Sequence, residues 1–393
     1  MRIGIDARFL THPQRGGFKT YTINLVNALA SVDHENEYIF YVDRELDDTS
    51  ILRNQNGNHE IKVVENKLPG VGMPFREQVF LRRHINKDRL DVVHFLCNTA
   101  TTNLPGTFVL TLHDTIQLTS QPKIDLRKGY RTNKRAAIMA YSKWAIERTA
   151  RAANKIITVS SYEKEQIADQ LDIHPDRIGV TLLAPNSIFK PACNQQRQEW
   201  RSTLAENFGI LGPFILAVGY EPRKNIPLLI EVFASMAQEF PQHELVIVAA
   251  EANSREAFKR LAQDCLVENR VRVLEALVPE ELAILYNLTD VFAFPSERES
   301  FGLPPLEALA CGAPVVAMDA TSLPEILGNG AIMVKNKGVS AWKEALTCVI
   351  RNENLRAALI EKGLQQATKF SFEACARKTV SMYQEAFQES DAQ

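Results

Sequence analysis

Short apolar runs alternate with amphipathic stretches along almost the whole of this 393-residue chain. The apolar runs are typical of strands, and helical patterns lie between many of them. The predicted strands are residues 2–5, 38–42, 61–64, 91–95, 107–112, 155–159, 214–218, 245–249, 271–274, 291–294 and 314–317. Strands that alternate with helices form parallel sheets with helices on both faces, so the sequence predicts an α/β fold.

The alternation is interrupted across residues 185–212, where prolines flank a polar segment at 194–199. We predict a domain boundary there, with doubly wound, Rossmann-like domains at 1–195 and 196–370. Two domains also fit the chain length, since a typical domain has roughly 150 residues. Two such domains facing each other create a cleft, and open α/β sheets bind ligands beyond the carboxyl ends of their strands.

Composition and charge exclude several classes of protein. Hydrophobic residues make up 45% and charged residues 23% of the chain, which excludes a disordered or fibrous protein. The formal net charge of −2 offers no electrostatic reason to bind nucleic acid. No apolar stretch approaches the roughly 20 residues that span a bilayer. The N-terminus reaches an acid at Asp6 and lacks the apolar core of a signal peptide.

The six cysteines are scattered, with no CxxC pair and no histidine at ligand spacing. This distribution favours neither a structural zinc site nor a disulfide framework. The sequence therefore predicts a soluble protein of the reducing cytoplasm.

The turn at residues 219–225 follows a predicted strand and precedes a helix with apolar residues at helical spacing. Asn225 is predicted to be the N-cap of this helix. Arg223 and Lys224 are then expected beside free backbone N–H groups at the positive helix end, which suits a diphosphate. The alternative is a pair of solvated surface cations.

Residues 294–312 form the segment richest in candidate functional groups. The segment runs from a predicted strand through a loop with Gly and Pro into a short helix. Glu299 lies in the loop and Glu307 in the helix, and a carboxylate accepts hydrogen bonds from paired sugar hydroxyls. The backbone N–H groups of residues 301–303 are available to an anion. The alternative is that Glu299 is solvated and Glu307 only complements the helix dipole.

Glu299 and Glu307 stand with seven residues between them, inside ESFGLPPLEALACGAPVV. This segment resembles the E-x7-E segment of the large retaining glycosyltransferase family 4, which uses nucleotide sugars on a GT-B fold. The similarity covers essentially the whole chain. Other stretches that fit the family are RGGFKTYTINL, TLHDTIQL, ITVSSYEKEQI, VGYEPRKNIPLLIEVF, LYNLTDVFAFPS and SLPEILGNGAIMV. The turn is similar to that of a subgroup with PRKN, and this chain has Tyr220 where many relatives carry an Arg.

The resemblance implies a GT-B fold with an acceptor-side domain at 1–195, a nucleotide-sugar domain at 196–370 and a C-terminal helix at 371–393 that returns to the first domain. In this fold Glu299 would contact the transferred sugar and Glu307 the ribose. The other residues implied to bind the donor are Gly16, Gly17, Arg223, Lys224, Ser300, Phe301, Gly302 and Leu303.

Two segments of the first half also carry candidate groups. Gly16 and Gly17 precede an amphipathic helix and permit close approach of the backbone to phosphate, although an ordinary flexible turn is the alternative. His113 and Asp114 directly follow the predicted strand at 107–112. A lone histidine is more often structural, but the resemblance places His113 and Asp114 at the donor sugar as catalytic candidates.

The residues and the resemblance together predict a retaining hexosyltransferase. It would transfer a sugar from a nucleoside diphosphate donor, GDP-mannose first, to a glycan or lipid-linked acceptor in cell-envelope polysaccharide or lipopolysaccharide synthesis. No Asp-x-Asp triplet occurs, so cations and helix N-termini must neutralise the diphosphate, and we predict catalysis without a metal or other cofactor. The alternatives are a non-catalytic nucleotide-sugar-binding protein and a GT-B nucleotide-sugar 2-epimerase.

Residues 123–155 are strongly basic. They contain ten Lys and Arg against two acidic residues, a local charge of +8 (10 − 2), with Tyr and Trp interleaved. Such a face suits peripheral contact with an anionic membrane, here the inner face of the cytoplasmic membrane. The alternative is a solvated helix face opposite a core stripe of Ile138, Ala145 and Ile146. RNA is less favoured because no base-stacking module surrounds the segment.

Overall fold

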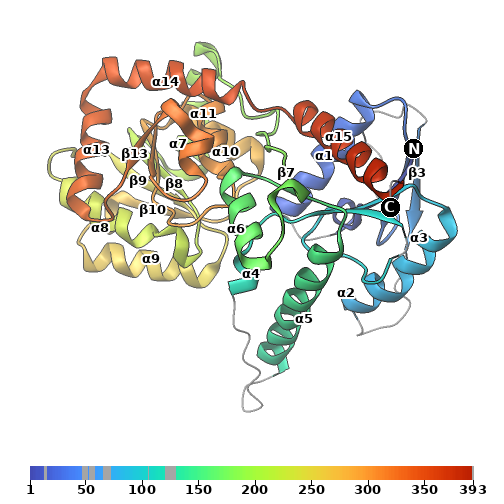
Figure 1. The fold of residues 1–393 in the computed structure, drawn as a ribbon. Coiled ribbons are helices and arrows are strands. Elements are labelled where there is room, and N and C mark those ends of the chain that lie inside the picture. Colours follow the sequence, from blue (N-terminus) through green and yellow to red (C-terminus); the bar gives the residue numbers. More distant parts are fainter. Residues whose placement is uncertain are drawn as a thin grey trace. The chain divides into compact units, whose positions relative to one another are not determined.

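The computed structural model describes residues 1–12, 16–46, 52, 58–64, 72–104, 106–119 and 130–391, with the side chains of 73 and 130–135 left out. The chain divides into two compact units (Figure 1). Unit 1 consists of Met1–Leu183 and Ser371–Gln393, and unit 2 of Ala184–Phe370. The predicted α/β class, with one parallel sheet in each half, is confirmed.

The boundary at 183/184 lies earlier than the predicted boundary at 195/196. The polar segment after the prolines is not a linker but the start of α7 (Asn194–Phe208). The residues before α7 pack within unit 2: the Asn287 side chain donates to the Lys190 carbonyl at 3.1 Å and accepts from the Ala192 N–H at 2.8 Å. Amino-acid composition indicates an irregular segment here, but only tertiary contacts decide to which unit the segment belongs.

The described residues of unit 1 form seven parallel strands in the order β3-β2-β1-β4-β5-β6-β7. Their bounds are β1 Arg2–Asp6, β2 Glu37–Val42, β3 His59–Val63, β4 Val92–Phe95, β5 Thr107–Thr111, β6 Lys155–Thr158 and β7 Ile178–Val180. All six strands predicted in this half are present. β7 was missed because its three residues form no distinct apolar run.

The helices of unit 1 include the C-terminal helix of the chain. Their bounds are η1 Arg8–Leu10, α1 Gly17–Val32, α2 Gly72–Phe75, η3 Arg76–Leu81, α3 Arg82–Asp88, α4 Ile116–Thr119, α5 Tyr130–Ala152, α6 Ser161–Leu171, η4 Pro175–Arg177 and α15 Phe372–Asp391. α15 packs against α1 and the central strands. A buried hydrogen bond of 2.7 Å joins its Tyr383 hydroxyl to Nδ1 of His94 on β4.

Unit 2 contains six parallel strands in the order β10-β9-β8-β11-β12-β13. Their bounds are β8 Phe214–Val218, β9 Glu244–Val248, β10 Val271–Leu274, β11 Val291–Phe294, β12 Val315–Met318 and β13 Ala331–Val334. The five strands predicted here are present, and β13 was missed. This is the strand order of a doubly wound nucleotide-binding sheet, and its direction of progress reverses between β8 and β11.

Helices of unit 2 pack in two groups. α8 contacts α9 and α13, whereas α11 contacts α10 and α14. The bounds are η5 Pro222–Lys224, α8 Ile226–Met236, α9 Ala252–Asp264, η6 Glu268–Arg270, α10 Pro279–Leu288, α11 Leu303–Ala310, α12 Leu323–Leu327, η7 Gly328–Gly330, α13 Val339–Arg351 and α14 Glu353–Ala367.

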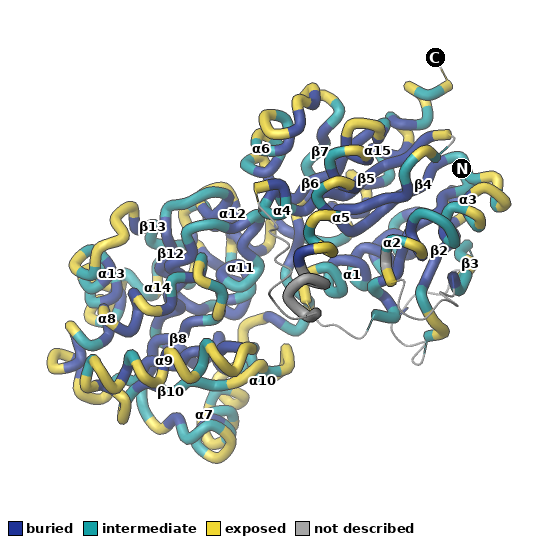
Figure 2. Tube along the Cα trace, turned by 90° about the horizontal axis from the view of Figure 1, so that it is seen from below, coloured by how far each residue is buried: buried dark blue, intermediate teal, exposed yellow. Residues whose placement is uncertain are grey.

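The strands form the buried centre of each unit, and the outer helix faces are exposed (Figure 2). α8 shows why: Ile226, Leu229, Ile230 and Phe233 recur at helical spacing, and each is at most 1% exposed. Across the described ranges, no helix combines the length and apolar character that crossing a bilayer requires.

Candidate functional site

The carboxyl ends of β8 and β11 lie side by side in the sheet of unit 2, because these two strands pair directly. A reversal of strand order is the place where doubly wound sheets bind ligands. The turn after β8 carries Arg223 and Lys224, and the loop after β11 carries Glu299. The topology thus brings together groups 75 positions apart in the sequence.

The Glu299 carboxylate is the centre of this site. Its Oε1 accepts hydrogen bonds from Nη1 of Arg223 and Nζ of Lys224, both at 2.7 Å, and from Oγ of Ser296. Glu299 and Lys224 are each 7% exposed. The Lys224 ammonium also lies 4.6 Å from the centre of the Phe294 ring. Buried charges are stable only when paired, and Glu299 is the partner of both cations.

Asn225 is the N-cap residue of α8, as predicted, but it does not cap the helix through its side chain. Asn225 has a left-handed backbone with φ +50°, and its side chain makes no capping hydrogen bond. Its Nδ2 instead donates to Glu297 at 3.3 Å. The short helix η5 turns the chain between β8 and α8, so that Arg223 and Lys224 are directed to Glu299.

The cluster Arg223–Lys224–Glu299 combines two cations with one carboxylate, and a second carboxylate lies beside it, with Oε1 of Glu221 3.7 Å from Nη2 of Arg223. The Arg223 side chain is 32% exposed and is the part of the cluster most open to solvent. The guanidinium group of Arg223 suits a phosphate oxygen pair.

The start of α11 lies next to the cluster in the chain. Gly302 has φ +102°, and a Cβ there would come within 2.6 Å of Cδ2 of Leu323. Glycine is therefore required for this turn. Pro304 and Pro305 lack N–H groups, so the backbone donors before the fourth helical residue are those of residues 301–303. Their position at a positive helix end suits an anion.

Ser300 and Phe301 connect Glu299 to that helix. Ser300 is half-buried. The Phe301 ring is 4% exposed and packs edge-on against Phe370 at 5.9 Å. The aromatic contact anchors the loop to the body of unit 2.

Glu307 lies on α11, where its Oε2 accepts a hydrogen bond of 3.4 Å from the Tyr286 hydroxyl. Burial raises the pKa of Glu307 to about 7, against the lowering effects of the Tyr286 hydrogen bond and the Lys224 charge. Near neutral pH its carboxyl group is thus present in both protonation states. Lys224 donates a hydrogen bond to Glu299, and its charge acts on the pKa of Glu307. The structure therefore brings together the two carboxylates that the sequence singled out.

Three hydroxyl groups of this site were missed by the sequence analysis: Ser296, Thr321 and Ser322. Ser296 bonds the Glu299 side chain, and the other two bond its backbone. Their position in the sequence could have identified them, because all three follow the carboxyl ends of predicted strands.

In unit 1, Gly16 and Gly17 begin α1. Gly16 has φ +147°, and a Cβ on either residue would meet no atom within 4 Å. Both residues are exposed. Packing among the described residues therefore requires glycine at neither position, although the φ of Gly16 favours glycine there. The predicted approach of a phosphate stays a prediction.

His113 and Asp114 both make structural contacts. Nε2 of His113 donates to the Leu96 carbonyl at 2.8 Å, and its ring packs edge-on against Tyr21 at 4.6 Å. Burial lowers the pKa of His113 to about 4, so the ring is neutral at pH 7. The Asp114 carboxylate accepts from the Ile116 N–H at 3.0 Å, at the start of α4. These contacts support the structural alternative for His113, and a catalytic role of either residue stays a prediction.

Part of the basic segment lies outside the described residues, namely Lys123, Arg127 and Lys128, and the side chains of 130–135 are not described. Lys155 does not belong to a surface face: it is 5% exposed, and its Nζ donates to Glu389 of α15 at 2.7 Å. Ile138, expected in the core stripe, is instead 48% exposed. Ala145 and Ile146 are buried as expected.

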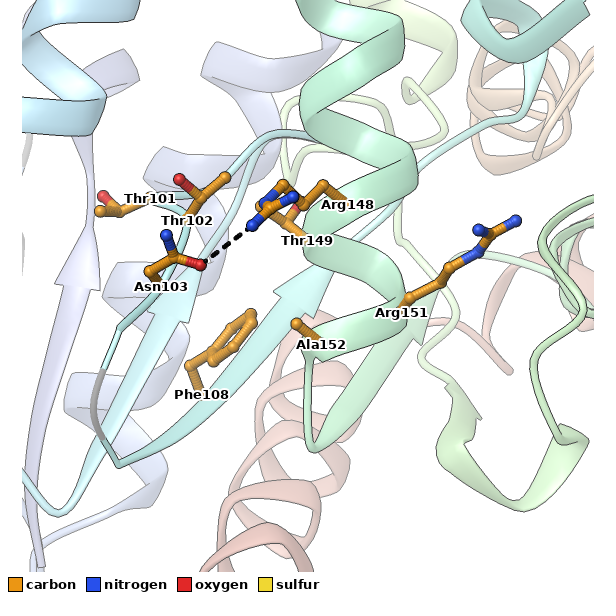
Figure 3. Close-up of a pocket in the computed structure, with 8 residues that line it drawn as sticks. All are labelled: Thr101, Thr102, Asn103, Phe108, Arg148, Thr149, Arg151 and Ala152. Atoms are coloured by element: carbon orange, nitrogen blue, oxygen red, sulfur yellow. Dashed lines mark hydrogen bonds between the residues drawn. The ribbon is translucent and has the colours of Figure 1, made fainter.

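The second half of α5 borders a pocket of about 320 Å³ (Figure 3). Its lining residues are Thr101, Thr102, Asn103, Phe108, Arg148, Thr149, Arg151 and Ala152. Arg148 donates to Oδ1 of Asn103 at 3.3 Å. Phe108 lies at the start of β5, so the pocket is at the amino-terminal edge of the sheet, away from the edge where ligands bind.

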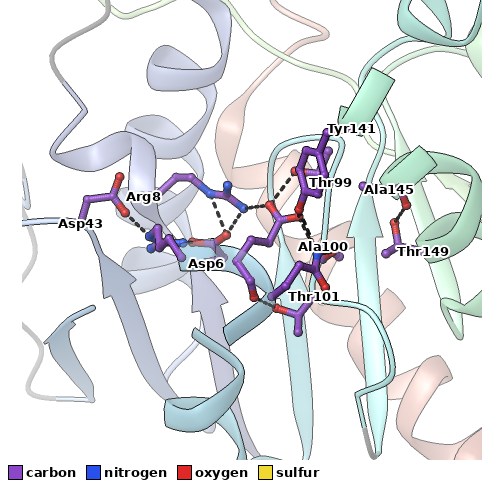
Figure 4. A network of polar contacts seen from close by, with 12 residues as sticks. Asp6, Arg8, Asp43, Thr99, Ala100, Thr101, Tyr141, Ala145 and Thr149 are labelled. Carbon is purple, nitrogen blue, oxygen red and sulfur yellow. Dashed lines mark hydrogen bonds and ion pairs between the residues drawn. The ribbon is translucent and has the colours of Figure 1, made fainter. Parts of the chain in front are cut away.

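A network of buried charges occupies the strand-order reversal of unit 1, at the carboxyl ends of β1 and β4 (Figure 4). Arg8 bonds Asp6 and, at 2.7 Å, Glu77, while Arg76 bonds Asp6 at 3.0 Å. The Thr99 hydroxyl donates to Glu77 at 2.7 Å. This network was not predicted; its signal in the sequence is the Asp-x-Arg directly after the first predicted strand. Its two cations, Arg8 and Arg76, bind three carboxylates, those of Asp6, Asp43 and Glu77, which leaves one formal negative charge. The candidate site for an anion is therefore the cluster of unit 2.

Each unit of the chain matches one known protein family. Residues 15–181 match "Glycosyltransferase Family 4", and residues 212–366 match "Glycosyl transferases group 1". The O-antigen chain mannosyltransferase B of Escherichia coli is 30% identical over 252 residues, which are 62% of this chain and 64% of that protein. The serotype-specific mannosyltransferase WbdA of Escherichia coli is 29% identical over 61% of this chain, but this match spans only 29% of WbdA. This chain thus spans less than two thirds of either relative.

Solved structures share the whole architecture at low sequence identity. WaaG, described as a glycosyltransferase involved in lipopolysaccharide biosynthesis, superposes with a TM-score of 0.70 at 16% identity, covering 98% of this chain and 99% of WaaG. HepE of Anabaena in complex with UDP-glucose superposes with a TM-score of 0.66 at 16% identity, covering 98% of this chain and 99% of HepE. These likenesses confirm the predicted GT-B fold.

Proposed function

We propose that this chain, which carries a glycosyltransferase family 4 domain followed by a glycosyl transferases group 1 domain, transfers a hexosyl group from a nucleoside diphosphate sugar to a hydroxyl acceptor. The observation that supports this most directly is the buried cluster of Glu299 with Arg223 and Lys224. The two cations suit the diphosphate, and a carboxylate suits the sugar hydroxyls.

In the proposed reaction the bond between the anomeric carbon and the phosphate oxygen breaks, and a bond to the acceptor oxygen forms on the same face of the sugar. The acceptor proton passes to the departing phosphate oxygen. Negative charge grows on the diphosphate as it leaves. Arg223, Lys224 and the backbone N–H groups of residues 301–303 stabilise that charge, which makes a metal unnecessary in this proposal.

Glu307 is proposed to bind the ribose of the donor. A carboxyl group with a pKa of about 7 accepts or donates hydrogen bonds near neutral pH, as ribose hydroxyls require. Ser300 lies between Glu299 and the amides and completes the proposed donor site.

GDP-mannose is the first proposed donor, and a UDP-hexose is the second. The name of the 30% identical relative, a mannosyltransferase of O-antigen chains, supports mannose and an envelope glycan or lipid-linked acceptor. The UDP-glucose complex of HepE supports the second choice, although its likeness to this chain is one of fold.

Peripheral contact with an anionic membrane is also proposed, through the described part of α5. The Trp144 side chain is 48% exposed, and Arg148 is exposed one helical turn further on. An exposed aromatic residue beside cations suits the interface of an anionic bilayer.

The test is to incubate the purified chain with GDP-mannose, and separately with UDP-glucose, with and without lipid-linked glycan acceptors. We expect acceptor-dependent release of nucleoside diphosphate, unchanged by a chelator, and a product with the anomeric configuration of the donor. Tight donor binding without turnover would instead support a nucleotide-sugar-binding protein. Loss of activity with the chelator would contradict the proposed charge stabilisation.

A further inference from the structure

Both backbone groups of Glu299 are held by side chains of a neighbouring turn. The Glu299 N–H donates to Oγ1 of Thr321 at 3.0 Å, and the Glu299 carbonyl accepts from Oγ of Ser322 at 2.9 Å. The same serine hydroxyl lies 3.0 Å from the Phe301 carbonyl. Thr321 and Ser322 follow β12, which pairs with β11. The loop that carries Glu299 is thereby tied to the turn after the next strand of the sheet.

Thr321 has a backbone conformation that its residue type disfavours. Its φ is +53°, and it is the one β-branched residue among the seven described non-glycine residues with positive φ. A β-branched side chain is strained in the left-handed region, whereas glycine adopts it freely. Strain of this kind persists where the surrounding structure holds the residue in place, and it clusters at functional sites.

The hydroxyl group explains why threonine rather than glycine is useful here. In the described part of the chain, the only hydrogen bond of the Thr321 side chain is the one from the Glu299 N–H. Glycine would relieve the strain but leave that N–H without this partner. The strain of Thr321 is thus coupled to the position of one residue, Glu299.

We propose that Thr321 is a positioning residue that acts through Glu299. The inference rests on the proposed function, because Glu299 is there the contact to the transferred sugar. By anchoring the Glu299 backbone, Thr321 sets where the carboxylate meets Arg223 and Lys224. It also sets the direction of the backbone that follows Glu299, with the N–H groups of residues 301–303, at the start of α11.

Three variants separate positioning from stability. Thr321→Ser keeps the hydroxyl and removes the branch, while Thr321→Gly relieves the strain and removes the hydroxyl. Leu266→Gly is the matched control, because Leu266 has φ +58° and is 87% exposed, remote in the sequence from the cluster. We expect all three variants to fold. Thr321→Ser and Leu266→Gly should melt at or above the temperature of the wild-type protein, whereas in Thr321→Gly the lost hydrogen bond offsets the relief of strain and the melting temperature should stay close to that of the wild type.

Steady-state kinetics with a nucleotide sugar give the first readout. We expect Thr321→Gly to lower kcat by about tenfold to a hundredfold, because small misplacements of a reacting geometry have such effects. The KM for the donor should change less, since Arg223, Lys224 and the helix end that hold the diphosphate remain. Thr321→Ser and Leu266→Gly should keep kcat within about twofold of wild type.

Amide hydrogen exchange gives a second readout that needs no activity. The Glu299 N–H should exchange faster in Thr321→Gly and at the wild-type rate in the other two variants. Equal kcat in Thr321→Gly and the wild-type protein, or a kcat in Thr321→Ser as low as in Thr321→Gly, would overturn the proposal. If the wild-type protein turns over no nucleotide sugar, the proposed function fails, and unchanged exchange in Thr321→Gly would then overturn the positioning role separately.

Discussion

Lys224 and Glu299 form a buried ion pair, with 2.7 Å between Nζ and Oε1 and only 9% of each side chain exposed. Arg223 binds the same carboxylate oxygen at 2.7 Å. In this structure the two cations proposed to hold a diphosphate are therefore already paired with the chain's own anion. A donor must compete with Glu299 for them, and several expectations depend on that competition.

Breaking this pair is expected to damage both stability and turnover. Lys224→Met removes one cation and leaves Glu299 with less compensation, which costs about 3–5 kcal/mol for a fully buried pair and less where Arg223 still binds it. Turnover should fall on the order of a hundredfold or more. The double variant Lys224→Met with Glu299→Gln should regain stability but not turnover, as measured by thermal unfolding and donor kinetics. A double variant no more stable than Lys224→Met would argue against a coupled pair.

Glu299→Gln is expected to separate binding from transfer. The neutral amide no longer competes for Arg223 and Lys224, so GDP and UDP without a sugar should bind more tightly, by about threefold to tenfold. Sugar transfer should nevertheless be largely lost. Titration calorimetry with the nucleoside diphosphates measures the first effect. Weaker binding than in the wild-type protein would show that Glu299 holds Arg223 and Lys224 in place for the diphosphate instead of competing with it.

Glu307 is expected to make stability depend on pH. Its pKa is about 7 in the folded chain, above the ordinary value of 4.5, because it is buried. The folded state therefore binds a proton that the unfolded state releases, and this contribution to stability is lost as the pH rises from about 4.5 to about 7. Denaturant unfolding at several pH values should show this fall in the wild-type protein and a smaller one in Glu307→Gln. Parallel pH profiles would contradict the raised pKa.

Two glycines are expected to respond differently to alanine. At Gly302 the φ is +102°, and an alanine Cβ would lie 2.6 Å from Cδ2 of Leu323. We expect Gly302→Ala to lower the free energy of unfolding by about 1–3 kcal/mol. At Gly17 a Cβ meets no atom within 4 Å, so stability should be kept or slightly increased. If a donor phosphate approaches Gly17, its alanine variant loses turnover at unchanged melting temperature. Unchanged turnover would leave Gly17 as an ordinary turn residue.

The proposed membrane contact depends on α5. Trp144→Ala should reduce co-sedimentation with anionic vesicles by about threefold or more, while neutral vesicles bind neither protein. Trp342→Ala is not a suitable control, because Trp342 is fully buried. Leu211→Ala is suitable, since Leu211 is 81% exposed in unit 2. Equal binding of the Trp144 variant and the wild-type protein would exclude this surface.

Much of the fold could be predicted because its signals are local. Buried parallel strands appear as short apolar runs, and eleven such runs predicted strands that are present. β7 and β13 were missed because short or half-exposed strands at a sheet edge lack this signal. The unit boundary was misplaced because polar residues begin a helix as readily as a linker.

The candidate site could be predicted only in part. Arg223, Lys224, Glu299 and Glu307 were singled out because they follow strands, where ligands bind. Their mutual contacts were not foreseen, and neither was the Thr321 hydroxyl that holds the Glu299 backbone. His113 stood in an equally suitable place in the sequence, yet its ring bonds the Leu96 carbonyl.

The amino-acid sequence by itself determined two parallel α/β units and placed cations, carboxylates and glycines at the turns where ligands bind, because hydrophobic periodicity and turn chemistry act over a few neighbouring residues. Tertiary structure alone decided that Arg223 and Lys224 bind Glu299, that Glu307 titrates near pH 7, and that the loop after 183 belongs to unit 2. These outcomes depend on burial and on partners distant in the chain, which meet only when β8 pairs with β11.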